Sequence, residues 1–126
     1  MKFEPNSPPR KFEAGNHKIV MISDIGRLQL LPDEQITIAN QRGAELDVTM
    51  KEWGYYATPS LNSRLLTFGL RSALVRNSMG RYFVLLIDSE MQGSFETYMA
   101  EQELTLALWL DDGEALDDLL LDRGGS

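Results

Sequence analysis

The sequence predicts an α+β domain with a mostly antiparallel sheet, and three observations indicate this class. Short apolar segments separated by turn residues fill the first half of the chain, a pattern typical of a β-meander. Residues 81–109 have the pattern of a strand, a helix and a second strand. The length of 126 residues suits one domain with its own core.

The N-terminal segment differs in composition from the rest. Residues 1–16 contain Pro5, Pro8 and Pro9 but few large apolar side chains, so we expect a mobile or loosely docked arm. Residues 17–122 are expected to form a single α+β domain, and residues 123–126 a frayed tail.

An antiparallel β-meander is predicted after the arm. Its strands are Lys18–Ser23, Arg27–Leu31, Gln35–Asn40 and Ala44–Met50. Asp24-Ile25-Gly26 is expected to form the turn between the first two strands. In the last two, Ile36 with Ile38 and Leu46 with Val48 alternate with other residues, which predicts one buried and one solvated face.

The middle of the chain admits two interpretations. In the first, a short helix over Ser60–Phe68 is followed by a hairpin of Leu70–Arg76 and Arg81–Ile87. In the second, the helix continues through residue 76. We favour the hairpin, because the longer helix would contain Gly69 and would be apolar on nearly all sides.

The last third predicts a helix, a strand and a short C-terminal helix. Met91, Phe95, Tyr98 and Met99 form a helical stripe within residues 90–102. The strand is expected at Leu104–Leu110 and the final helix at Glu114–Leu121. The resulting strand–helix–strand unit can place two parallel strands in one sheet.

Composition excludes several kinds of chemistry. The chain has no cysteine and one histidine, His17, so thiolate nucleophiles, Cys-ligated metals and multi-His metal sites are excluded. We find no phosphate-binding loop or dinucleotide fingerprint, and we predict no metal and no cofactor. The longest strongly apolar run, Phe83–Ile87, is too short to span a bilayer. We therefore expect a soluble, cytoplasmic protein without a membrane partner.

Charge is distributed unevenly along the chain. The net charge is −7 overall, −1 over residues 1–52, +4 over residues 53–87 and −10 over residues 88–126. This balance opposes nucleic-acid binding, which needs a basic surface. The basic segment is also rich in aromatic residues, so we predict a binding site for an anionic group there. The predicted site residues are Trp53, Tyr55, Tyr56, Ser60, Asn62, Arg64, Arg71, Arg76 and Arg81.

A structural interpretation of the same residues stays open. Two of the aromatic rings would pack in the core, and the four arginines would pair with the acidic last third. In the hairpin, Arg76 and Arg81 flank the turn and should lie near each other.

The expected function is a non-enzymatic binding or accessory domain that recognises an anionic small molecule or a protein partner. The alternative is a small hydrolase, isomerase or lyase, in which Tyr55, Tyr56 or Ser60 works with Asp88 or Asp24. A third hypothesis is docking of the acidic last third onto a basic partner. Leu116, Leu119 and Leu121 suggest a homo-oligomer interface, or else they cover the core of the domain.

Overall fold

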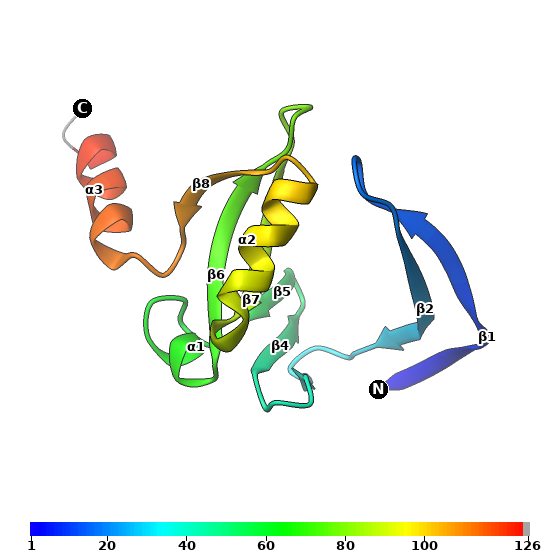
Figure 1. The fold of residues 1–126 in the computed structure, drawn as a ribbon. Coiled ribbons are helices and arrows are strands. Elements are labelled where there is room, and N and C mark those ends of the chain that lie inside the picture. The colour runs from blue at the N-terminus through cyan, green and yellow to red at the C-terminus, as the bar shows by residue number, and fades with distance from the viewer. Residues whose placement is uncertain (125–126) are drawn as a thin grey trace.

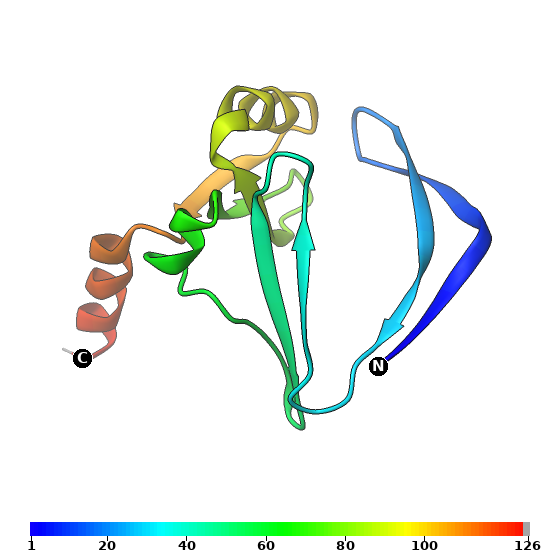
Figure 2. The same ribbon diagram turned by 90° about the horizontal axis from the view of Figure 1, so that it is seen from below.

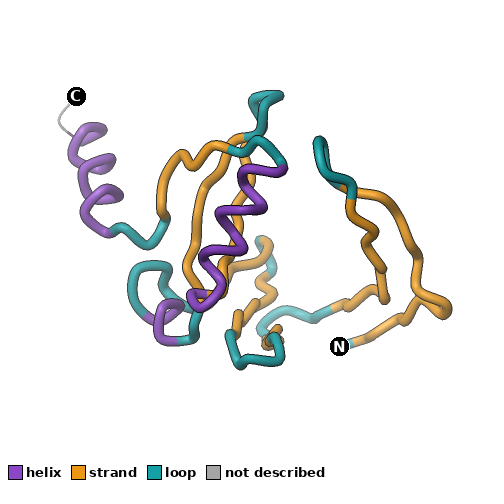
Figure 3. The backbone as a smooth tube through the Cα atoms, viewed as in Figure 1, coloured by secondary structure: helices purple, strands orange, loops and turns teal. Residues whose placement is uncertain are grey.

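The computed structural model describes residues 1–124 and has the predicted α+β architecture, with antiparallel sheets throughout the described chain (Figure 1; Figure 3). The N-terminal half contains β1 (Lys2–Ala14), β2 (Val20–Gln29), β3 (Gln35–Ala39), β4 (Glu45–Lys51) and β5 (Gly54–Ala57). The rest contains α1 (Arg64–Thr67), β6 (Leu70–Arg76), β7 (Tyr82–Asp88), the 3-10 turn η1 (Ser89–Met91), α2 (Gln92–Glu101), β8 (Thr105–Trp109) and α3 (Gly113–Gly124).

The central sheet has the strand order β7-β6-β8 and carries the main core. Both outer strands pair antiparallel with β6, so β7 and β8 run parallel to each other and α2 connects them. This is the predicted strand–helix–strand unit. Ala73, Val75, Ile87 and Phe95 form a buried cluster between this sheet and α2. Burial of these side chains holds the helix on the sheet.

The middle sheet has the order β3-β4-β5, and its first two strands match the prediction. Ile36 pairs with Val48 and Ile38 with Leu46, so the apolar side chains predicted to share a face do so across the two strands. The predicted burial of this face is wrong at Ile38, which is 58% exposed. β5 was not predicted. It pairs Tyr55 with Met50, which extends the same face.

The N-terminal part corrects the predicted meander. β1 and β2 form a long hairpin, and β2 continues through Asp24-Ile25-Gly26, where we had predicted a turn. The register shifts at this point, between Pro5 and Arg10 of β1. The Asp24 side chain accepts hydrogen bonds from the Gly26 amide and from Arg10, so these residues support an irregularity inside the hairpin. The mobility expected for residues 1–16 stays a prediction.

The middle of the chain follows the first of the two interpretations. α1 covers only Arg64–Thr67 of the predicted helix. Gly69 has φ +87°, a left-handed conformation that ends the helical path before β6. β6 and β7 then form the predicted hairpin, with Arg76 opposite Tyr82. At the other end of the chain, α3 includes residues 123–124 of the predicted frayed tail, and residues 125–126 lie outside the described part.

The overall shape is open. The β1–β2 hairpin projects on one side of the central sheet and α3 on the other, in both views (Figure 1; Figure 2). β1 and β2 pack mainly on each other. α3 likewise has no extensive packing on another described element. No helix in the described residues is long and apolar enough to cross a membrane.

Candidate functional site

The nine residues predicted to bind an anion lie at several separate places. Trp53 and Tyr55 are at the tip of the β4–β5 hairpin, where they are 73% and 65% exposed. The Trp53 ring stacks on Tyr56, with centroids 6.2 Å apart and planes 20° apart. This hairpin tip points away from the central sheet (Figure 2), so the rings do not join the arginines of β6.

Arg71 is already occupied by partners inside the protein. Its Nε and Nη2 donate to the two carboxylate oxygens of Asp111, at 2.8 and 3.2 Å, and its Nη1 donates to Gln92 at 3.2 Å. The guanidinium also lies 3.7 Å from the centroid of the Trp109 ring. The Asp111 hydrogen bond raises the pKa of Arg71 further above its ordinary value. Arg71 therefore joins β6, β8 and α2, as the structural interpretation expected.

The other three arginines make no ion pair among the described residues. Arg64 lies on α1, over the Phe68 ring at 5.5 Å, near the start of β6. Arg76 ends β6 and Arg81 immediately precedes β7, so both lie at the opposite end of that strand, beside one turn. Of the predicted polar residues, Ser60 accepts a hydrogen bond from the Arg64 amide. Asn62 lies close to Gly113 at the start of α3.

The carboxylates of the enzyme hypothesis are held in structural contacts. Asp88 accepts hydrogen bonds from Asn40, Arg42 and the Glu90 amide at 2.8 to 3.0 Å, and the Asn40 bond is the largest of the effects that lower its pKa. The Arg10 hydrogen bond likewise lowers the pKa of Asp24. Both groups are therefore stabilised as carboxylates, which makes them weak proton acceptors near neutral pH.

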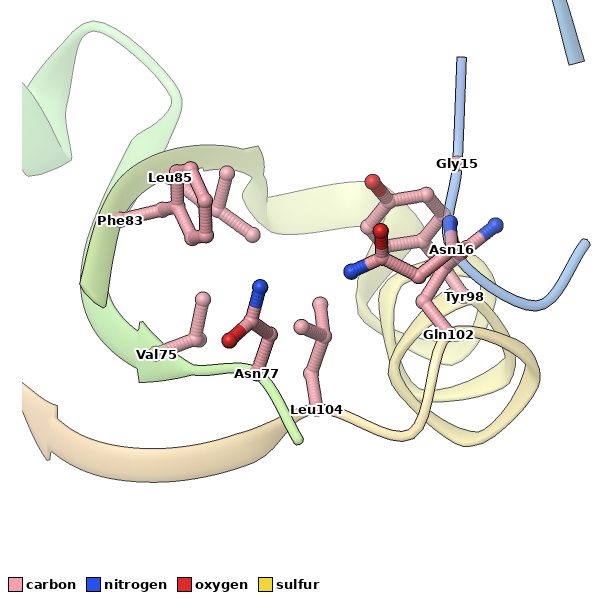
Figure 4. A pocket seen from close by; sticks show the side chains of 9 residues that line it. All are labelled: Gly15, Asn16, Val75, Asn77, Phe83, Leu85, Tyr98, Gln102 and Leu104. Atoms are coloured by element: carbon pink, nitrogen blue, oxygen red, sulfur yellow. Dashed lines mark hydrogen bonds between the residues drawn. The ribbon is translucent and has the colours of Figure 1, made fainter. Parts of the chain in front are cut away.

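A pocket of about 230 Å³ lies where α2, the central sheet and the turn after β1 meet. Val75, Phe83 and Leu85 lie across it from Asn16, Tyr98 and Gln102 (Figure 4). Asn77 is 5% exposed; its Oδ1 accepts from the amides of Met79 and Arg81, and its amide nitrogen points into the pocket. The lining contains no Asp, Glu, Lys, Arg or His. It suits an uncharged group, such as an apolar side chain with a hydrogen-bond acceptor.

The pocket also marks where the N-terminal hairpin is attached to the body. The buried Gln102 side chain accepts from the amides of Asn16 and His17, at 3.0 and 3.3 Å, and donates to the Lys18 carbonyl at 2.6 Å. His17 adds an ion pair with Glu103 when it is protonated. We call residues 15–19 the attachment turn. It holds one end of the hairpin at a fixed place on α2.

The hairpin has two chemically different faces. Phe3 pairs with Leu28, Phe12 with Ile22 and Ala14 with Val20, and since side chains alternate along a strand, all of these share one face. The same alternation places the Arg10–Asp24 ion pair on this face, between Ile22 and Leu28 of β2. The opposite face carries Lys2, Glu4, Lys11, Glu13 and Arg27, together with Met21 and Ser23. We call the first set, defined as Phe3, Phe12, Ala14, Val20, Ile22 and Leu28, the apolar arm face.

The apolar arm face is open to solvent. Its five large side chains are 37% to 51% exposed. Sequence reasoning missed this face because the strand pattern of residues 2–14 is interrupted by prolines. The alternation of Phe12 and Ala14 with charged residues was the signal that could have revealed it.

α3 presents a second uncovered apolar surface. Leu119, Leu120 and Leu121 are 51%, 68% and 71% exposed, whereas Leu116 is half-buried. Of the three leucines predicted to form an oligomer interface, Leu119 and Leu121 are thus accessible to a partner. The alternative interpretation, that these leucines cover the core, is wrong for residues 119–121, because their side chains are exposed.

Comparison with known protein families, with curated proteins and with solved structures found no match. Within residues 1–124, no three His, Asp or Glu side chains gather in a way that would hold a metal ion.

Proposed function

We propose that this protein is a non-enzymatic binding module that docks onto a protein partner through the apolar arm face. The observation that carries the proposal is the size of the accessible surface. It measures 8944 Å², whereas a compact monomer of 14.2 kDa exposes ~6,800 Å². The difference of about 2,100 Å² is more than one partner contributes to a standard interface, ~800 Å², and fits an obligate one.

The buried core supports the same conclusion. Among the described residues, the buried apolar side chains are Ala44, Leu65, Ala73, Val75, Ile87 and Phe95. All of them belong to the central sheet and the elements next to it, and none belongs to the hairpin. A two-stranded hairpin is at best marginally stable alone in water, so a hairpin without a core of its own needs a covering partner.

A site-specific cross-linking experiment tests this proposal. A benzophenone amino acid in place of Phe12 should give one discrete cross-linked product in cells expressing the full chain. The matched control places the same probe at Glu13, on the charged face of the same strand. Equal products at the two positions, or no product at Phe12, would contradict the proposal.

Recognition of an anionic group is a second candidate function, favoured by Arg76 and Arg81. These two guanidinium groups flank one turn and make no ion pair in the described chain. Titration with inorganic phosphate, followed by NMR, should shift the amides of residues 76–82. An unchanged response of the Arg76→Ala, Arg81→Ala double variant would remove this candidate. No observation favours the hydrolase, isomerase or lyase alternative.

A further inference from the structure

We infer that the partner of the apolar arm face is helix α3 of a second copy of this chain, in a closed antiparallel dimer. The inference rests on the proposed function and names its partner. Two elements of the chain, the β1–β2 hairpin and α3, have apolar side chains exposed to solvent, and each could cover those of the other. The hairpin presents an apolar sheet face, and α3 presents an apolar helix stripe.

The helix is the right kind of element for a sheet face. Leu116, Leu119 and Leu120 stand three and four residues apart, so they form one stripe along α3. A 12-residue helix is marginal in water by itself, and most helical stability in proteins comes from packing of such a stripe. The leucines of α3 would pack on Phe12, Val20 and Ile22, which are neighbours on the apolar arm face, as a helix packs on a sheet.

The shape of one copy favours this pairing over contact of the arm with another arm. A two-fold contact between two arms would leave α3 uncovered in both copies, because α3 lies on the far side of the central sheet (Figure 1; Figure 2). Contact of the arm with α3 covers both surfaces in each copy.

The arrangement of the two elements requires a second molecule. The hairpin and α3 project on opposite sides of the central sheet in both views, so they cannot meet within one chain (Figure 1; Figure 2). Two copies lying antiparallel make the arm–α3 contact twice, which closes a two-fold dimer. Each copy then covers both of its open surfaces. This accounts for an excess area as large as ~2,100 Å², which one contact would not fill.

The test is the oligomeric state of the full chain, measured by light scattering after size-exclusion chromatography. The wild-type chain should be a dimer. Phe12→Asp in the arm and Leu120→Asp in α3 should each weaken dimerisation at least about 100-fold, because each change disrupts both contacts. Both side chains are exposed in one copy, so the near-UV circular dichroism of each monomer should stay unchanged.

A mixture of the two variants is the decisive measurement. In a mixed dimer, the intact arm of the Leu120→Asp chain meets the intact α3 of the Phe12→Asp chain, so one contact survives. The mixture should therefore form dimers at concentrations where each variant alone is monomeric.

Two results would overturn the inference. If the wild-type chain dimerises but the mixture gains no dimer beyond what the two variants form separately, the arm does not contact α3 of the other copy. If the wild-type chain is a monomer, the second copy is not the partner. The Phe12 cross-link separates this failure from failure of the proposed function, because an adduct with a different protein leaves the docking role of the arm standing.

Discussion

At the residue scale, Arg71 shows why a pattern in the sequence can suggest a ligand where the structure has an internal partner. The sequence places four arginines in a segment free of Asp and Glu, so they look unpaired. In the fold, Asp111 follows β8, the strand that pairs with β6, and it is 40 residues away from Arg71 in sequence. Its side chain is only 6% exposed, so the pair is partly buried. Local composition cannot reveal such a partner.

We predict that Arg71→Ala lowers the free energy of unfolding by about 2 kcal/mol, because it leaves the Asp111 carboxylate without its charged donor. Arg76→Ala is the matched control, since Arg76 is exposed and makes no ion pair in the described chain; its effect should stay within about 0.5 kcal/mol. Urea denaturation followed by circular dichroism measures both. Equal losses for the two variants would show that Arg71 is not a structural residue.

At the scale of elements, the sequence predicted those strands and helices whose pattern is local. The β6–β7 hairpin, α2 and β8 have strong alternation or a clear helical stripe, and they occur where expected. β1 was missed because Pro5, Pro8 and Pro9 argue against a strand in the middle of a sheet. β1 pairs on one side only, in a two-stranded sheet, and this edge position tolerates proline.

β2 and the candidate interface could not be predicted for a related reason. Asp24 and Gly26 are typical turn residues, yet pairing with β1 uses them at a register shift within a continuous hairpin. Without β1, the two faces of β2 cannot be assigned to an interior or an exterior. The apolar arm face therefore depends on long-range pairing that residue patterns do not encode by themselves.

Attachment of the hairpin to the body depends on one side chain, Gln102. We predict that Gln102→Ala speeds hydrogen exchange of the Asn16 and His17 amides by roughly 10- to 100-fold, because both amides lose their acceptor. Glu101→Ala is the neighbouring control. It removes only an exposed ion pair with Lys18, and the same two amides should keep their protection. Unchanged exchange in Gln102→Ala would show that other contacts hold the attachment turn.

At the scale of the whole molecule, the fold brings the start of the acidic last third against the basic segment, where Asp111 pairs with Arg71. The basic segment includes β6 and β7, and the acidic last third includes β8 and α3. The sheet order β7-β6-β8 places an acidic-segment strand directly beside a basic-segment strand. The predicted anion site needed the arginines to lie together, whereas Arg71 and Arg76 lie toward opposite ends of β6 and Arg64 lies on α1.

The small core and the two open surfaces give a prediction for the stability of the whole protein. If association covers the arm and α3, folding is linked to association by mass action. The midpoint of thermal unfolding should then rise with protein concentration, whereas that of Phe12→Asp should not. Scanning calorimetry at two concentrations a hundred-fold apart measures this. A midpoint independent of concentration in the wild-type chain would argue that the folded unit is a single copy.

Gly15 in the attachment turn has a consequence for how the protein tolerates variation. Its φ is +109°, and a Cβ at this position would lie 2.1 Å from the Lys18 carbonyl oxygen. Any other residue would force apart the backbone that Gln102 holds. Although Gly15 lies on the surface, a saturation mutagenesis screen should find it as intolerant as a core residue, for reasons of backbone geometry alone.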